Sequence, residues 1–389
     1  MDFSFSESQN LLRESVRDLM KRYPAEYWRG KDERKEFPGE FEKSSGELGL
    51  FGVMIPEAYG GSGLGVTEAA IILQAVADSN GALDACSVVH MGMFGINPVM
   101  RHGTEEQRKE FLPRAAKGLV HSCFGVTEPD AGTDTSRIKT FARREGDHYV
   151  VNGQKVWTSR GLQAEYILLL CRTTPLDQVG AKRFSGLTLL FAPIDRNAVK
   201  MRPIAKMGRH AVESCETFIT DYKVPVGCLV GEEGKGFYHL LDGLNPERIM
   251  IAAEAVGLGY QAISRAVAYA KERVVFGRPI GQNQGVQIPL AEAYSQLQAA
   301  ELMMLRAAWM YDNGLPCGPE ANMAKLRGTE AAHLAVNTAF ETFGGYGYAK
   351  EYDIERLYRQ LPLTRVAPIT NTLVRTQVAE HALGLPKSY

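Results

Sequence analysis

The chain changes its sequence pattern twice, and the order of the three patterns constrains the fold more than any single motif does. From about residue 5 to 118, apolar residues recur at helical spacing, and this pattern returns in longer runs from about residue 234 onward. Between about 121 and 228, short runs rich in β-branched and aromatic residues predict strands. A dinucleotide-binding parallel sheet needs strands and helices in alternation, so this order excludes it. We expect an α+β multidomain protein with an all-α domain at 1–120, a β-domain at 121–232 and a helical-bundle domain at 233–389.

The last third of the chain carries the longest predicted helices. They run over about 237–275, 288–312 and 320–343, and Pro246 is either a kink or a first-turn residue of the first one. Helices of this length with apolar faces indicate a helical bundle, whose outer faces can also pair subunits.

The middle third carries the strands, and one dipeptide within it predicts a turn. Two predicted strands, 148–151 and 154–159, lie on either side of Asn152-Gly153. This dipeptide is the strongest two-residue hairpin signal, so we expect a hairpin at this point. Further strands are predicted at 165–172, 186–192 and 213–221.

Composition excludes several classes of protein. The formal net charge is −1, from 44 Lys and Arg against 45 Asp and Glu, which does not favour nucleic acid or an anionic membrane as partner. Six cysteines without a CxxC pair predict reduced thiols, and eight histidines without HExxH spacing predict no metal site. No apolar run reaches the length of a membrane span, and the first 20 residues form an amphipathic pattern without a signal peptide's apolar stretch. We therefore expect a protein of the reducing cytoplasm.

Two glycine-rich stretches and the lack of a GxSxG motif limit the kinds of binding site and enzyme that the sequence supports. The glycine-rich stretch 60–65 lacks a preceding strand and a GK[ST] ending, so a turn is favoured over a phosphate loop. The stretch 344–347 closes a long predicted helix, where its glycines could let a ligand approach the backbone. No GxSxG elbow is present, which gives a hydrolase little support.

Two neighbouring stretches at the start of the β segment are candidates for a binding site. Residues 124–134 (FGVTEPDAGTD) combine hydroxyls with glycines that allow backbone amides to face a ligand. Residues 156–160 end a predicted strand and place Trp157 beside hydroxyls, where it can stack on a planar ring and hydrogen-bond the ring's polar edge. The alternative is that this tryptophan is an ordinary core residue.

Near residue 247, a carboxylate stands at the start of an apolar helix face. The stretch reads Asn245-Pro246-Glu247-Arg248 and leads into a helical run. Glutamate is almost never fully buried unless it is paired or takes part in chemistry, so Glu247 is a candidate functional residue. The alternatives are a solvated residue or an ion pair. Glu254, two turns further along near the same face, is a weaker candidate.

Four stretches in the same order along the whole chain carry a family resemblance. VTEPDAGTD, NGQKVWTS, ERVVFGRPIGQNQ and ETFGGYGY together resemble the acyl-CoA dehydrogenase family. The resemblance implies an N-terminal helical domain, a middle β-barrel or sandwich domain and a C-terminal four-helix bundle. It also implies a homotetramer built as a pair of dimers, with FAD between the β-domain and the C-terminal helices.

The resemblance assigns the cofactor contacts residue by residue. Val126 and Thr127 are expected at the pyrimidine edge of the flavin, Thr133 at the pyrophosphate and Trp157 on the isoalloxazine. Ser159 stands where a threonine usually bonds flavin N5. The contacts expected from a neighbouring subunit, on the pyrophosphate and adenine, are Arg273, Phe276 and Gln284. The remaining matches are Gly345, Thr370 and Glu341, the last in place of the family's glutamine.

The resemblance also implies the reaction and its base. Most relatives carry the base in a Tyr-Glu-Gly-Thr stretch, and this chain has Ala367-Pro368-Ile369-Thr370 at that place. Isovaleryl- and long-chain acyl-CoA dehydrogenases instead use a glutamate before an arginine on the first long C-terminal helix, which matches Glu247 and Arg248. The expected function is FAD-dependent α,β-dehydrogenation of an acyl-CoA, with Glu247 taking the α-proton, flavin N5 the β-hydride, and an electron-transfer flavoprotein the electrons.

Position 368 leaves an open question and a substrate expectation. Thr133, Arg248, Ala367 and Pro368 are expected to bind substrate, but proline has no N–H for the thioester carbonyl. Either a neighbouring amide such as that of Ile369 replaces it, which is our hypothesis, or a ribityl hydroxyl of FAD acts alone. The small side chain of Ala367 suggests a branched, cyclic or bulky acyl group. The alternatives are oxidase, monooxygenase or desulfinase chemistry on the same fold, or a non-catalytic paralogue that binds flavin or acyl-CoA.

Overall fold

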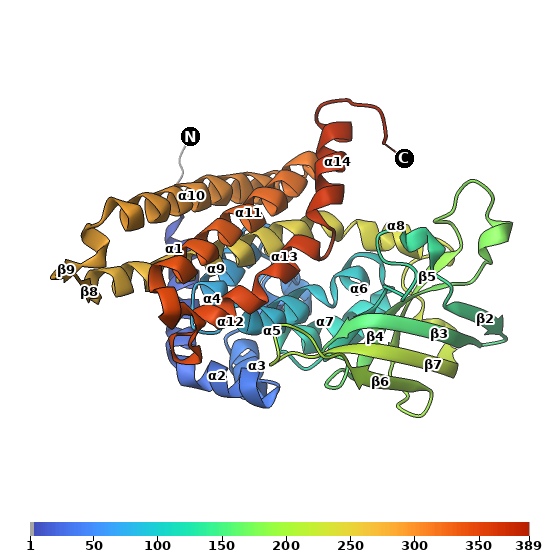
Figure 1. The fold of residues 1–389 in the computed structure, drawn as a ribbon. Helices are drawn as coiled ribbons and strands as arrows, with labels where there is room; N and C mark the ends of the chain where they lie inside the picture. The colour runs from blue at the N-terminus through green and yellow to red at the C-terminus, as the bar shows by residue number, and fades with distance from the viewer. Residues whose placement is uncertain (1–3, 389) are drawn as a thin grey trace.

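Helices from both ends of the chain pack together in one part of the molecule, and the middle third forms a curled sheet in the other (Figure 1). The computed structural model describes residues 4–388. The N-terminal helices are α1 (Glu7–Lys21), α2 (Ala25–Arg34), α3 (Gly39–Glu47), α4 (Val66–Ala77), α5 (Ala82–Phe94), α6 (Asn97–His102) and α7 (Glu105–Ala116). The expected fold class is confirmed, while the boundaries at residues 120 and 232 stay predictions.

Local sequence explains where the outer N-terminal helices begin. In α1 the Ser6 hydroxyl accepts from the Gln9 backbone and the Gln9 side chain accepts from the Ser6 backbone, which satisfies two otherwise unpaired N–H groups. Thr104 and Gln107 form the same capping box at α7. The glycine-rich stretch 60–65 precedes α4 as a turn, and the backbone N–H groups of residues 61–64 donate to carbonyls of residues 52–56.

The middle sheet has seven strands in the order β1-β4-β2-β3-β7-β6, and β5 pairs with β4. The strands are β1 (Ser122–Gly125), β2 (Phe141–Glu145), β3 (His148–Ser159), β4 (Tyr166–Arg172), β5 (Leu187–Pro193), β6 (Val199–Pro203) and β7 (Ser214–Pro225). Alternate residues of β4 enter two different cores: Leu168 and Leu170 pack with α6 and α7, while Ile167 and Leu169 pack inside the curl. Because both faces of β4 are buried, almost every residue of this strand is apolar, which explains the continuous apolar run in the sequence.

The hairpin expected at Asn152-Gly153 is wrong. β3 runs unbroken through this dipeptide, with a bulge there against β7, and the actual hairpin turn is Gly146-Asp147 between β2 and β3. Gly153 lies so close to Thr140 that a side-chain Cβ would stand 2.3 Å from the Thr140 Oγ1 atom. The Asn152 amide bonds Asp221 on β7 through two hydrogen bonds of 3.1 and 2.9 Å. The dipeptide therefore forms a bulge, at which Gly153 allows the backbone to approach Thr140 closely.

The C-terminal helices are α8 (Gly236–Leu241), α9 (Leu244–Glu272), α10 (Gln284–Asp312), α11 (Gly318–Phe343), α12 (Ile354–Gln360), α13 (Pro362–Val366) and α14 (Asn371–His381). The single helix expected over 237–275 is divided in two, and Pro246 lies in the first turn of α9, where its missing N–H costs nothing. Gly257 and Gly259 let α9 approach α4 and α10 closely, because a Cβ on either would clash. None of the helices within residues 4–388 is long and apolar enough to cross a membrane.

Candidate functional site

A buried lysine ties the segment after β1 to the neighbouring strand β3. The Lys155 Nζ atom donates to the Val126 carbonyl at 3.0 Å and to the Glu128 carboxylate at 2.9 Å. The Val156 N–H donates to the Thr127 carbonyl at 2.9 Å. Burial raises the pKa of Glu128, but Lys155 and the amides of residues 139 and 140 more than offset this, so its pKa lies below the usual value. The backbone of residues 126–128 is thereby held beside the end of β3.

Trp157 stands at that end of β3 and is not a core residue. Its backbone has φ of 63°, and 56% of the residue is exposed. Two residues further, the Ser159 Oγ atom lies 3.4 Å from the Ser214 Oγ atom. Within residues 4–388, no protein group hydrogen-bonds the Thr127 hydroxyl. An accessible indole face next to hydroxyls fits a planar ring with a polar edge, as the flavin of FAD has. Thr133 lies exposed on the loop beyond.

The residues expected to complete the cofactor site lie at the opposite end of the molecule. Arg273 ends α9, Phe276 is the tip of the small hairpin β8 (Val274–Val275) and β9 (Arg278–Pro279), and Gln284 begins α10. Figure 1 shows this hairpin far from the middle sheet. Phe276 is fully exposed with φ of 51°, an unusual conformation for a bulky side chain. One chain does not bring the two groups together.

Two other expected contacts lie near this end. Glu341 is in the last turn of α11, and Gly345 lies in the 3₁₀ turn Gly344–Tyr348 that follows. The Arg273 guanidinium lies over the ring of Tyr346, with 5.6 Å between its central carbon and the ring centroid. This contact holds Arg273 against the same turn.

The segment 367–370 is held by a lysine that the sequence analysis did not identify. The buried Lys325 on α11 donates to the Ile369 carbonyl at 2.8 Å and to the Asn371 side chain at 2.7 Å. Burial, together with the nearby charges of Arg248 and Arg365, lowers the pKa of Lys325 to about 8. The Thr370 hydroxyl caps α14 by accepting from the Leu373 N–H at 3.2 Å. The sequence does contain a signal for it, because a lysine on the alanine-rich, buried face of α11 indicates a buried partner.

Glu247 lies in the first turn of α9 and is partly buried. Burial raises the pKa of its carboxyl above the ordinary value; His90 and Arg248 oppose the rise, and Glu254 adds to it. A raised pKa suits a carboxylate that must accept a proton near neutral pH. The Arg248 guanidinium donates to the Asn245 side chain at 3.0 Å.

The rival carboxylate, Glu254, has a partner. Its Oε1 atom lies 2.6 Å from the His90 Nδ1 atom, and both side chains are buried. His90 was not identified from the sequence, where it is one histidine in the apolar run of α5. Among the described residues, no cluster of three or more His, Cys, Asp or Glu side chains could hold a metal ion.

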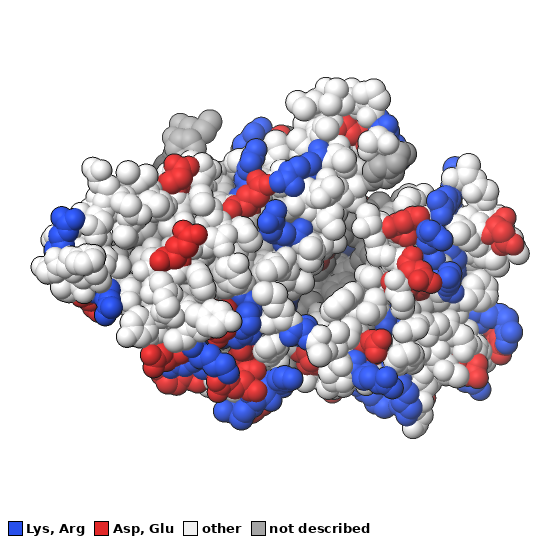
Figure 2. All heavy atoms as spheres, in the orientation of Figure 1, with Lys and Arg blue, Asp and Glu red and all other residues white. Residues whose placement is uncertain are grey.

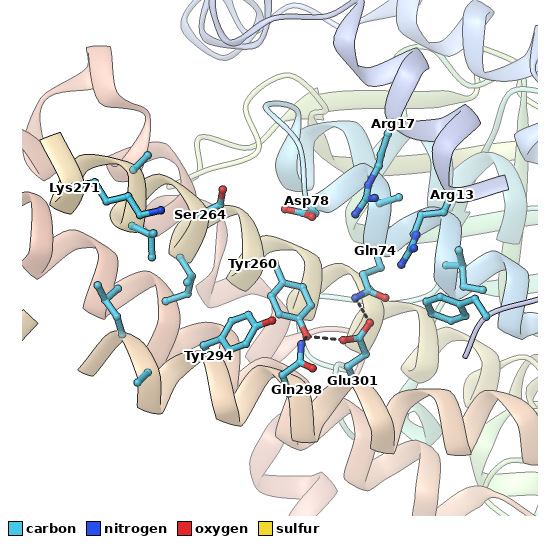
Figure 3. A pocket seen from close by; sticks show the side chains of 18 of the residues that line it. Arg13, Arg17, Gln74, Asp78, Tyr260, Ser264, Lys271, Tyr294, Gln298 and Glu301 are labelled. Carbon is cyan, nitrogen blue, oxygen red and sulfur yellow. Dashed lines mark hydrogen bonds between the residues drawn. The ribbon is translucent and has the colours of Figure 1, made fainter. Parts of the chain in front are cut away.

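A cavity of about 950 Å³ lies between α1, α4, α9 and α10, away from this site (Figure 3). Arg13 and Arg17 of α1 line it on one side, and Tyr260 and Glu301 face it from α9 and α10 (Figure 3). None of the residues named above for the cofactor or the base lines it. Burial raises the pKa of Asp78 in its wall to about 7; Arg17 opposes the rise and Glu301 adds to it.

Replacing Asp78 is expected to change how stability depends on pH. The pKa of this carboxyl rises from 3.8 in the unfolded chain to about 7 in the folded one. Below pH 3.8 the carboxyl is protonated in both states and does not destabilise the fold, but as pH rises through about 7 the folded protein must carry a buried charge and loses stability. Asp78→Asn should therefore match wild type near pH 4 and exceed its unfolding free energy at pH 8, by roughly 4 kcal/mol at most. Thermal unfolding across this range measures it. The control is Asp18→Asn, which removes a carboxylate from an exposed ion pair on α1. Equal curves of stability against pH for the Asp78 variant and wild type would contradict the prediction.

The fold and site together define a class of protein. The curled sheet follows one helical segment in the chain and precedes another. An accessible tryptophan lies near the end of a central strand beside hydroxyls, and a carboxylate with a raised pKa lies on the first long C-terminal helix. This combination fits a flavin-dependent oxidoreductase, the class that the family resemblance implies. Figure 2 shows positive and negative residues interspersed on one face, and a hollow between the C-terminal helices and the sheet.

The chain belongs to the acyl-CoA dehydrogenase family. Models of the family's N-terminal, middle and C-terminal domains match residues 6–119, 123–222 and 234–383. The chain is 38% identical to the acyl-CoA dehydrogenase FadE12 of Mycobacterium tuberculosis over 392 residues, covering 100% of both. It is 36% identical to the probable acyl-CoA dehydrogenase YngJ of Bacillus subtilis, covering 98% and 100%. The butyryl-CoA dehydrogenase structure of Megasphaera elsdenii superimposes with a TM-score of 0.93 at 29% identity, covering 98% and 100%. The protein is therefore an FAD-dependent oxidoreductase.

Proposed function

We propose that this protein oxidises an acyl-CoA thioester to its 2-enoyl-CoA, with Glu247 as the base that takes the α-proton. The observation that carries the proposal is the pairing of two features. Position 368, where most relatives have the base, is a proline, and the carboxyl of Glu247 has a raised pKa at the start of α9. The carboxylate accepts the proton from Cα and holds it as a neutral acid, which its partly buried setting favours.

The chain's residues divide the remaining tasks. FAD, when bound, supplies the ring that accepts the β-hydride. Val126, Thr127, Trp157, Ser159, Thr133 and Thr370 would hold the flavin and pyrophosphate, and the ties of Lys155 keep the first two in place. For the thioester carbonyl we propose the Ile369 N–H, since no protein group within residues 4–388 accepts from it, and Lys325 holds the carbonyl of the same residue. A structure with acyl-CoA and no protein N–H near that oxygen would contradict this assignment.

A second subunit would supply the rest of the cofactor site. Arg273, Phe276 and Gln284 lie on or beside the β8–β9 hairpin, at the opposite end of the molecule from the middle sheet that carries Trp157, which supports the proposed homotetramer of paired dimers (Figure 1). We propose an electron-transfer flavoprotein as the electron acceptor, in the cytoplasm. A structure from a study of the electron transferring flavoprotein of Acidaminococcus fermentans matches the chain with a TM-score of 0.93 at 29% identity. This match supports an electron-transfer flavoprotein as the partner.

The test is anaerobic titration of the purified yellow protein with short, branched, cyclic and long acyl-CoAs. We expect one class of thioester, branched or bulky because of Ala367, to bleach the flavin absorbance and to yield the 2-enoyl-CoA by mass. The matching 2-enoyl-CoA, which has no hydride to give, is the control ligand. Rapid reoxidation by oxygen with peroxide formation would favour an oxidase. Tight binding of thioesters without bleaching would remove the dehydrogenase proposal.

A further inference from the structure

A second buried pair stands behind the proposed base. Glu254 follows Glu247 by seven residues, close to two helical turns, so both project from nearly the same face of α9. Across that face, His90 of α5 lies 2.6 Å from the Glu254 carboxylate. The His90 ring meets Phe94 edge-on, and Phe94 stacks on Phe124 of β1, two residues before Val126. The pair therefore borders the strand that leads into the cofactor segment.

The charges around this pair come from three elements. On α5 the titratable groups are Asp84 and the thiol of Cys86, which burial keeps uncharged, and on α9 they are Glu247, Arg248 and Glu254. From the segment between β6 and β7, the guanidinium of Arg209 reaches in and donates to the Ser87 hydroxyl at 2.7 Å. Burial lowers the pKa of His90, but the carboxylates of Glu254 and Glu247 more than offset this and raise it overall, against the opposing charge of Arg209.

We propose that His90 and Glu254 are positioning residues that fix the net charge facing Glu247 and so set the pH at which the base becomes active. The proposal rests on the proposed function of Glu247. His90 with its proton cancels the charge of Glu254, and it also attracts the Glu247 carboxylate directly. Without it, two like charges face each other across two turns of one buried helix face, and the protonated form of Glu247 becomes favoured.

The experiment measures the rate of anaerobic flavin reduction by the best thioester between pH 5 and 9. His90→Gln, which keeps a donor for Glu254 but no charge, should move the acidic limb of the profile upward by about one pH unit. His90→Gln combined with Glu254→Gln removes both charges and should move the limb back towards wild type. His102→Gln, which alters another histidine–carboxylate pair, with Asp242, should leave it unchanged. Equal limbs in all variants, or no return in the double variant, would overturn the proposal.

A second measurement needs no turnover, so failure of the proposed function would be seen separately. The folded-state pKa of Glu247 is raised, so its contribution to stability is present at low pH and lost as pH rises through that value. Glu247→Gln should therefore gain stability relative to its parent as pH rises from the ordinary carboxyl pKa to the raised one, above which the gain is constant. In the His90→Gln background the folded-state pKa is higher still, so this gain should become larger and level off at a higher pH. The same midpoint in both backgrounds would overturn the inference, even if no acyl-CoA bleaches the flavin.

Discussion

Glu247→Gln is expected to lower the rate of flavin reduction by an acyl-CoA by about 10²–10⁴-fold, the usual contribution of a positioned general base. Glutamine keeps the size and polarity of the side chain but cannot take the α-proton. The carboxyl of Glu247 is partly buried, and burial has raised its pKa, which makes it an even stronger base relative to water. Water is therefore a poor substitute for it in removing the α-proton. FAD content and acyl-CoA affinity should stay close to wild type. Stopped-flow reduction under anaerobic conditions, at several pH values, measures the effect.

The same helix offers a matched control for this substitution. Glu272 lies at the exposed C-terminal end of α9, where Glu→Gln changes the same atoms without a buried setting. Glu272→Gln should reduce the flavin at the wild-type rate. If Glu247→Gln is also as fast as wild type, another group removes the proton, and Glu254 becomes the next candidate. Loss of FAD from Glu247→Gln would instead indicate a structural role.

Lys155→Ala is expected to lower the free energy of unfolding by about 3–5 kcal/mol, because it leaves the buried carboxylate of Glu128 without its counter-charge. The Lys155 side chain is fully buried and bonds both Glu128 and the Val126 carbonyl. The segment expected to meet the flavin edge loses this tie, so FAD should also dissociate more readily. Denaturant unfolding of the holoenzyme and the ratio of flavin to protein absorbance after dialysis measure the two effects.

A neighbouring lysine provides the control for this prediction. Lys139 forms an exposed ion pair with Asp130, and pairs of that kind contribute about 0–1 kcal/mol, so Lys139→Ala should unfold almost as wild type does. Combining Lys155→Met with Glu128→Gln removes both buried charges and should recover part of the lost stability. Near-wild-type stability and flavin retention in Lys155→Ala would show that the pair is not needed to hold residues 126–128.

Local sequence patterns were sufficient for much of the fold. The order of helices, strands and helices was predictable because burial periodicity of 3.6 or 2 residues is a property of neighbouring positions. The same reasoning placed Trp157 near a strand end. It failed at Asn152-Gly153, since the same two residues serve a hairpin or a bulge depending on what packs against them. Here the residues that pack against them are Thr140, which directly precedes β2, and Asp221 on β7.

The candidate site was predictable only in part, and the missing part consists of buried charges. His90 and Glu254 are 164 residues apart in sequence, Lys325 and Ile369 are 44 apart, and Lys155 and Glu128 are 27 apart. A charged residue within an apolar pattern signals that a partner must exist, because an unpaired buried charge is too costly. Which residue becomes that partner depends on how distant helices and strands pack. That choice was made by the tertiary structure alone.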